Sequence, residues 1–250
     1  MFLKVLKKIL GLIGYKLINK NLIKNDRLIA KHSSKKVVNL LEKFFSEDLV
    51  KTVVQIGAND GKRFDDLNIY IKKYSPKAIL VEPITEYYNE LKLNYINCEN
   101  VFFENSAIST NNEINFLYKV ESSKSKLYGE HIKGITSFNK SHLINHGVSK
   151  NHIEKEIVNS ISFSTLIKKY TIKNLDLLVI DAEGYDANIL MDFFSSTQLK
   201  PLIIFEYIHI KNDLLVKLVE MIISNNFEFF KLEENIICIP KDRDVFKNLF

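Results

Sequence analysis

The sequence predicts an α/β domain built on a mostly parallel, seven-stranded sheet with helices on both faces. The first observation is the rhythm of the chain, in which short apolar runs alternate with segments of helical periodicity. The second is a glycine-bracketed turn at 57–61, directly after the first apolar run, which lets the chain turn sharply into a helix. The third is a pair of apolar runs near the carboxyl terminus, which predicts that an antiparallel hairpin closes the sheet. A length of 250 residues is sufficient for one such domain.

The first part of the domain repeats a strand followed by a helix. A helix at 35–50 leads into the first strand, 52–56, and a helix from about 64 to 73 ends before Pro76. The second strand ends at Glu82. The next expected elements are a helix at 84–94 and a third strand that starts at 101–104.

The rhythm breaks between residues 111 and 160. Residues 114–120 alternate as in a strand, and Ser, Lys, Gly and His dominate the remainder. An insertion of this size in a compact domain is typically functional, so we expect a lid or a wall of the substrate site. The insertion contains Ser137, His142, His146 and His152. Because these histidines show no metal-binding spacing, we expect them to be exposed to solvent.

The last part of the chain resumes the rhythm. Residues 161–170 predict a helix or the lead from a strand into a helix, and the continuous apolar run 175–180 predicts a fully buried strand. A helix at 187–194, a strand at 202–205 and an amphipathic helix at 213–224 follow. The closing hairpin pairs residues 227–231 with 236–239.

The turn after the first strand and the carboxylate after the second predict a nucleoside pocket. Glu82 stands about 20 residues beyond the turn, where a carboxylate can accept hydrogen bonds from both ribose hydroxyls. Dinucleotide enzymes usually carry G-x-G-x-x-G, whereas three residues separate Gly57 from Gly61 here. Asp60 adds a negative charge to the turn, which disfavours a pyrophosphate. The pattern therefore favours S-adenosylmethionine (SAM), a phosphate-free sulfonium, over a nicotinamide cofactor.

The candidate cofactor-binding residues follow from this pocket. Glu82 is expected at the ribose hydroxyls, and Asp181 is expected beside the methyl donor. Asn105 and Ser106 are expected near the adenine edge, with a purely structural role as the alternative. The residues expected along the methionine and ribose are Gly57, Ala58, Asn59 and Gly61.

Methyl transfer to oxygen needs an aligned acceptor hydroxyl and a group that takes its proton. Asp181 and Glu183 follow the fourth strand of the parallel sheet, and the fifth strand is followed by Glu206 and His209. Asp181 is the first candidate, as a general base or as a group that orients acceptor and donor; the alternative is a cap on the following helix. Glu183 is expected to hold its loop. Glu206 and His209 either bind the acceptor or join Asp181 around a divalent cation such as magnesium or manganese.

Five short sequence blocks, taken in their order along the chain, support a resemblance to a known protein family. They are Gln-Ile-Gly-Ala-Asn-Asp-Gly at 55–61, Val-Glu-Pro at 81–83, Asn-Ser-Ala-Ile-Ser at 105–109, Leu-Val-Ile-Asp-Ala-Glu-Gly-Tyr-Asp at 178–186 and Ile-Phe-Glu-Tyr at 204–207. With them, the chain resembles the FkbM family of SAM-dependent methyltransferases over about residues 50–240. Val179 stands where many members carry lysine, and Gln55 where many methyltransferases carry an acidic residue. The resemblance implies a Rossmann-like class I methyltransferase fold and O-methylation of glycans or natural products.

We therefore expect a SAM-dependent O-methyltransferase that acts on a hydroxyl of a sugar or related polyol in surface-glycan biosynthesis. One alternative is a non-catalytic, membrane-associated scaffold on the same fold, which failure to bind SAM would favour. A second is a nicotinamide-dependent oxidoreductase, against which the missing G-x-G-x-x-G pattern argues.

The composition narrows the partners and the compartment. The formal net charge is +5, and arginine occurs only at Arg27, Arg63 and Arg243. We expect no nucleic-acid partner, because such surfaces favour arginine interleaved with aromatic residues. Cys98 and Cys238 form no C-x-x-C pair, so neither a disulfide framework nor a thiolate zinc site is expected. This cysteine usage suits the cytoplasm.

Residues 1–34 are expected to form a helical extension, and residues 35–250 the methyltransferase domain. Apolar residues recur at helical spacing within 1–24, among six lysines. The longest uncharged run, 9–15, is too short to span a bilayer. Two interpretations are open: a basic amphipathic helix that lies on the inner face of an anionic membrane, or a helix that packs on the domain or pairs with a second subunit.

Overall fold

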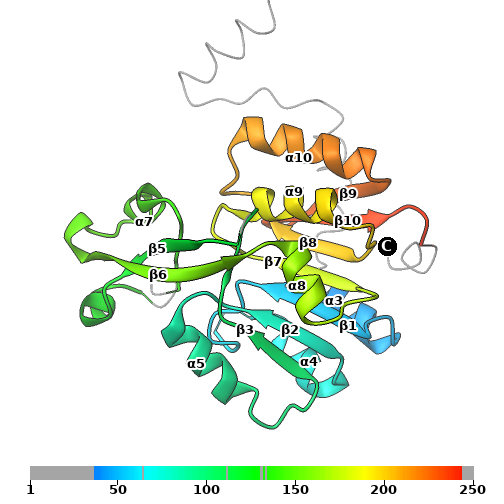
Figure 1. Cartoon of the computed structure of the whole chain (residues 1–250), viewed down its shortest axis with the longest axis horizontal. Helices are drawn as coiled ribbons and strands as arrows, with labels where there is room; N and C mark the ends of the chain where they lie inside the picture. Colours follow the sequence, from blue (N-terminus) through cyan, green and yellow to red (C-terminus); the bar gives the residue numbers. More distant parts are fainter. Residues whose placement is uncertain (1–36, 64, 111, 130–131, 133, 244–250) are drawn as a thin grey trace, which may run out of the picture.

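A seven-stranded sheet forms the centre of the computed structural model, which describes residues 37–63, 65–110, 112–129, 132 and 134–243 (Figure 1). The strands are β1 (Thr52–Ile56), β2 (Lys77–Val81), β3 (Val101–Glu104), β7 (Leu177–Ile180), β8 (Leu202–Glu206), β9 (Phe227–Leu232) and β10 (Asn235–Pro240). Their order is β3-β2-β1-β7-β8-β10-β9; the first five are parallel, and β10 runs antiparallel to β8 and β9. The predicted parallel sheet with a closing hairpin is confirmed. The predicted extension, residues 1–34, lies outside the described residues.

Helices cover both faces of this sheet, as predicted (Figure 1). The helices α3 (Val37–Ser46), α4 (Asn68–Tyr74) and α5 (Thr85–Asn94) contribute to one core, and α8 (Phe163–Lys169), α9 (Asp186–Ser196) and α10 (Asn212–Ser224) to the other. Successive residues of a strand point to opposite faces, so Val53 packs in the first core and Val54 in the second. Both are fully buried, which explains why the central strands are continuous apolar runs.

Two helix boundaries differ from the expected ones for local reasons. The helix expected to reach residue 50 ends at Ser46, because Asp48 adopts a left-handed backbone conformation with φ of 59°. The helix expected from about residue 64 begins at Asn68. The Asp65 carboxylate accepts a hydrogen bond from the amide of Leu67, and this contact holds a turn ahead of the helix.

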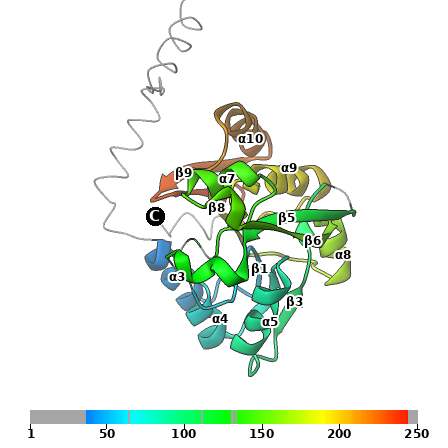
Figure 2. The same ribbon diagram turned by 90° about the vertical axis from the view of Figure 1, so that its left-hand side faces the viewer.

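The insertion forms a small second sheet with short helices. The strands β5 (Ile114–Val120) and β6 (Ile153–Ile161) join β4 (Ala107–Ile108), which precedes the insertion, in the order β4-β6-β5. Between β5 and β6 lie the 3₁₀ helices η1 (Ser122–Leu127) and η2 (Lys150–His152) and the helix α7 (Lys140–Asn145). The β5–β6 ribbon extends to one side of the main sheet in Figure 1, and Figure 2 views the molecule from that side. The predicted strand at 114–120 is confirmed.

No helix within the described part of the chain has the length and apolar character that crossing a membrane requires.

Candidate active site

A cavity of about 510 Å³ lies at the carboxyl ends of β1, β2, β7 and β8, a volume typical of sites for small molecules. From the β1 and β2 side, the predicted residues Gly57, Ala58, Asn59, Glu82 and Ser106 line it. The other wall carries the predicted Asp181, Glu206 and His209. The sequence-predicted residues from these four strand ends therefore meet at one cavity.

The turn after β1 requires glycine at its first position. Gly57 has φ of +83°, and a Cβ atom there would lie 1.8 Å from the backbone oxygen of Asp181. The amides of Gly57 and Ala58 both donate to the carbonyl oxygen of Val81. The turn is thereby held against the ends of β2 and β7 with room for a ligand beside its backbone.

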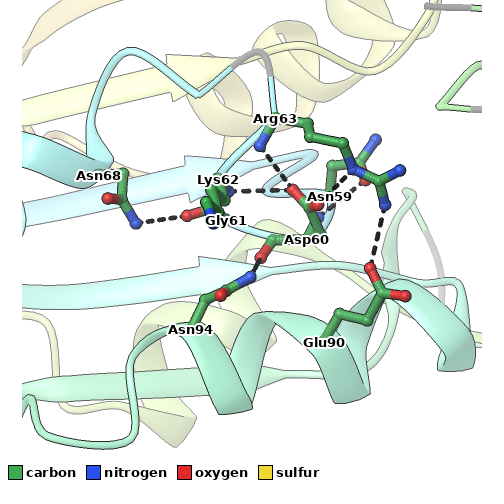
Figure 3. A network of polar contacts seen from close by, with 8 residues as sticks. All are labelled: Asn59, Asp60, Gly61, Lys62, Arg63, Asn68, Glu90 and Asn94. Atoms are coloured by element: carbon green, nitrogen blue, oxygen red, sulfur yellow. Dashed lines mark hydrogen bonds and ion pairs between the residues drawn. The ribbon is translucent and has the colours of Figure 1, made fainter. Parts of the chain in front are cut away.

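Asp60 organises the turn rather than facing the cavity (Figure 3). Its buried carboxylate accepts hydrogen bonds from the amides of Lys62 and Arg63 and pairs with the Arg63 guanidinium at 2.5 Å. Arg63 also contacts Glu90 at 3.0 Å, and the Asn94 side chain donates to the Asp60 carbonyl oxygen. The Asp60 carboxylate, whose charge was expected to act on the ligand, instead pairs with Arg63 and is not among the described residues that line the cavity.

Glu82 ties the loops after β1 and β2 together. Its carboxylate is buried and accepts one hydrogen bond from the amide of Asn59 (2.9 Å) and one from the amide of Ile84 (2.8 Å). Burial raises its pKa to about 7, and the nearby charges of Glu156 and Asp181 act in the same direction. Each oxygen has a further lone pair, so the group can still accept from ribose hydroxyls.

Gln55 supplies a polar atom that sequence reasoning did not assign. Its side-chain nitrogen donates to Asp65 at 3.1 Å, whereas its buried Oε1 has no hydrogen-bond partner among the described residues. Both Gln55 and Asp65 line the cavity. Since a buried acceptor without a partner is costly, Oε1 is available to a donor from a water molecule or a bound ligand.

Two predicted cofactor residues are not among the described residues that line the cavity: Gly61 and Asn105. A Cβ atom on Gly61 would meet the Leu91 side chain at 2.4 Å, so this glycine permits close packing behind the turn. Asn105 donates to the carbonyl oxygens of Glu82 and Pro83 and holds the loop after β2. Ser106 lines the cavity and donates to Glu104 at 2.8 Å.

The loop after β7 separates a structural carboxylate from an accessible one. Asp186 is fully buried and accepts hydrogen bonds from the amides of Ala182 and Gly184, which shapes the loop. Burial raises the pKa of Asp186 to about 8. Asp181 accepts from the backbone of Glu183, yet its side chain remains open to the cavity. The surrounding protein and the charge of Glu183 raise the pKa of Asp181 to about 6.

Glu206, the last residue of β8, adds another carboxylate to the same wall. Burial raises its pKa to about 8, and Asp181 and Glu183 contribute to the shift. His209 follows with its Nε2 3.6 Å from Glu206 Oε2. Burial lowers the pKa of His209, and the neighbouring His142 adds to this effect. The wall therefore concentrates carboxylates that disfavour one another's ionised form.

The prediction that the histidines of the insertion are exposed is wrong. His142, His146 and His152 are all partly buried, and His142 and His146 pack against His209. The sequence did contain a signal for the contact between His142 and His146. Their spacing of four residues places both on one face of a helix. Their encounter with His209 depends on tertiary packing and has no local signal.

The insertion docks on the loop after β7. The Ser137 hydroxyl donates to the Glu183 carbonyl oxygen at 3.2 Å, and Phe138 packs on Tyr185 with ring centroids 4.6 Å apart. His142 Nε2 lies 2.9 Å from a Glu183 carboxylate oxygen. Residues of the insertion, including Leu117, Ile135 and Phe138, line the cavity opposite the strand ends.

Sheet order, glycine turn, Glu82 and the closing hairpin together define a class I SAM-dependent methyltransferase. The model of the methyltransferase FkbM domain matches residues 55–229. The chain therefore belongs to the FkbM methyltransferase family.

Solved structures of other methyltransferases are similar to this chain at low identity. Methyltransferase FkbM from Methylobacillus flagellatus is 11% identical with a TM-score of 0.47, and the match covers 76% of this chain and 43% of that one. Ribosomal protein L11 methylase from Lactobacillus delbrueckii is 14% identical with a TM-score of 0.40 (80% and 75% covered). Fibrillarin from Aeropyrum pernix, crystallised with natively bound SAM, is 9% identical with a TM-score of 0.40 (75% and 65% covered). No curated protein matches the chain.

Proposed function

We propose that the protein transfers a methyl group from SAM to a hydroxyl of a sugar or related polyol, in the biosynthesis of surface glycans. The observation that carries this proposal is the pairing of two walls in one cavity. One wall has the turn and Glu82 for a nucleoside, and the other has Asp181 and Glu206 at the ends of neighbouring strands.

The cofactor wall fits SAM. Gly57 leaves the turn open beside the backbone, and Glu82 offers lone pairs to the ribose. The unpartnered Oε1 of Gln55 can accept from the SAM ammonium group, with the Asp65 carboxylate behind it. SAM supplies a methyl group that is already activated by the sulfonium.

The acceptor wall fits an uncharged hydroxyl compound. The carboxylates of Asp181, Glu183 and Glu206 all line the cavity, and their ionised forms disfavour a phosphate group directly beside the acceptor oxygen. A carboxylate can accept a hydrogen bond from a hydroxyl, orient its oxygen toward the methyl group and take its proton. Asp181 is the exposed residue of the three, whereas Glu183 and Glu206 are partly buried.

Asp181→Asn tests this assignment. The amide keeps the shape of the side chain but cannot take a proton, so we expect kcat to fall about 100-fold or more. The measurement is methyl transfer from isotope-labelled SAM to a panel of free, nucleotide-linked and lipid-linked sugars, with SAM affinity determined in parallel. An unchanged kcat in the variant would remove Asp181 from the chemistry. Transfer only to amines or nucleic acid would overturn the proposed acceptor class.

A further inference from the structure

Three histidines from two distant parts of the chain converge at the junction of the insertion with the main sheet. His142 belongs to α7, His146 caps its carboxyl end, and His209 follows β8. Their ring centroids are 4.5, 4.7 and 5.1 Å apart. One ligand-capable nitrogen of each imidazole lies within 4.8 Å of the other two. Nothing in methyl transfer from SAM requires three imidazoles at this spacing.

Hydrogen bonds orient two of these imidazoles as they are oriented in metal sites. His146 Nδ1 donates to the carbonyl oxygen of His142 at 2.9 Å, so its Nε2 keeps a lone pair. His142 Nε2 lies 2.9 Å from the Glu183 carboxylate, which accepts the hydrogen and leaves Nδ1 with a lone pair. A ligating histidine typically donates its other ring nitrogen to a carbonyl or carboxylate in this way.

Carboxylates lie beside the three histidines. Glu183, Glu206 and His209 form a second group whose ligand atoms lie within 4.8 Å of one another, and it shares His209 with the histidine group. The negative charges compensate a divalent cation. Magnesium and calcium prefer sets made of oxygen ligands, whereas three imidazoles with a nearby carboxylate suit a first-row transition metal.

We propose that His142, His146 and His209 bind a divalent first-row transition metal ion, of the class that includes zinc. This assignment differs from the magnesium-type site of Asp181, Glu206 and His209 that was one of two alternatives from the sequence, because Asp181 belongs to neither group of candidate ligands. Three protein ligands leave a coordination position for a further ligand. Since His146 and His209 line the cavity, the ion lies in its wall, where an acceptor hydroxyl can complete the coordination. That role rests on the proposed function, whereas metal binding itself does not.

Cobalt(II) titration of the full-length, untagged, chelator-treated protein tests the proposal. We expect one equivalent of Co²⁺ to produce the visible absorption of a low-coordinate ion, and Zn²⁺ to displace it. His146→Ala and His209→Ala should weaken binding by at least tenfold. Glu183→Gln should weaken it by about 10- to 100-fold, because it removes the charge that supports His142.

His152→Ala is the matched control, since this histidine lies in the same insertion but hydrogen-bonds to Tyr128 outside the cluster. It should bind Co²⁺ as the unaltered protein does, and circular dichroism checks that every variant is folded. Absence of binding by the unaltered protein, or equal binding by the His146 and His152 variants, would overturn the proposal. SAM titration of the same samples separates this result from a failure of the methyltransferase proposal, because the absorption signal needs neither SAM nor acceptor.

Discussion

The protonation state of Glu82 is expected to make the affinity for SAM depend on pH. Its carboxylate accepts hydrogen bonds from the amides of Asn59 and Ile84. Burial raises the pKa of this carboxyl group to about 7. Ribose hydroxyls donate to the ionised form, so SAM binding favours loss of the proton. Below a pH of about 7 the free protein holds that proton, and we expect the affinity for SAM to fall by up to about tenfold per pH unit.

Calorimetric titration between pH 5.5 and pH 8.5, roughly one and a half units on each side of this pKa, measures the effect. Glu82→Gln provides the control, since an amide does not titrate; its affinity should be lower and nearly independent of pH. Glu156 and Asp181 also carry charge near this site and remain in the variant. An equally steep pH dependence in the variant would assign the effect to them instead of Glu82.

At the residue scale, the sequence located side chains whose position depends on strand ends. Gly57, Glu82, Asp181 and Glu206 were placed correctly at the cavity because parallel strands put their carboxyl ends at one edge. The sequence did not reveal which charges are already paired. Asp60 was misinterpreted because its partnership with Arg63 depends on how the turn folds.

Among the elements, the turn after β1 allows a prediction about the stability of a Gly57 variant. Gly57→Ala places a Cβ atom 1.8 Å from the Asp181 backbone oxygen at φ of +83°. We expect the free energy of unfolding to fall by about 3 kcal/mol or more, from the clash and the strained conformation together. Chemical denaturation measures the change.

Gly147→Ala is the matched control. Gly147 has φ of +86°, but a Cβ atom there would meet nothing within 4 Å. The free energy of unfolding of this variant should fall only by the cost of the left-handed conformation, about 1–2 kcal/mol. If the two variants lost the same stability, the close approach of β1 and β7 at this turn would not be the reason for the glycine.

The order and type of the main elements could be predicted because hydrophobic periodicity reports them directly. The boundaries of α3 and α4 could not, since single aspartates end or delay these helices. The insertion was recognised as an interruption, but β4, β6 and α7 were not expected. Few residues of β6 are buried, so its sequence shows no clear apolar alternation. Elements of two and six residues carry too little periodicity to detect.

At the scale of the whole molecule, the cavity divides between two parts of the chain. The main sheet provides the proposed cofactor wall, and the insertion docks on the proposed acceptor side through Ser137, Phe138 and His142. We propose that variation in this insertion sets the acceptor, while the sheet retains SAM.

The basic segment 1–24, outside the described residues, is proposed to contact an anionic membrane surface. Each lysine near such a surface contributes about 1 kcal/mol of attraction. The charge reversals Lys7→Glu and Lys8→Glu should therefore weaken binding to phosphatidylglycerol vesicles at least tenfold in co-sedimentation, and high salt should weaken binding of the unaltered chain. Equal sedimentation with neutral vesicles would contradict an electrostatic contact and favour packing on protein.

Calorimetric titration of the purified protein with SAM, alongside Glu82→Ala, tests directly whether this cavity binds the cofactor. Binding at a one-to-one ratio, weakened at least tenfold by the variant, is the predicted result, because the alanine removes the acceptors expected for the ribose and frees the amides of Asn59 and Ile84. Absence of binding to both SAM and its demethylated product would contradict the assignment of this cavity and leave the fold as a scaffold without turnover.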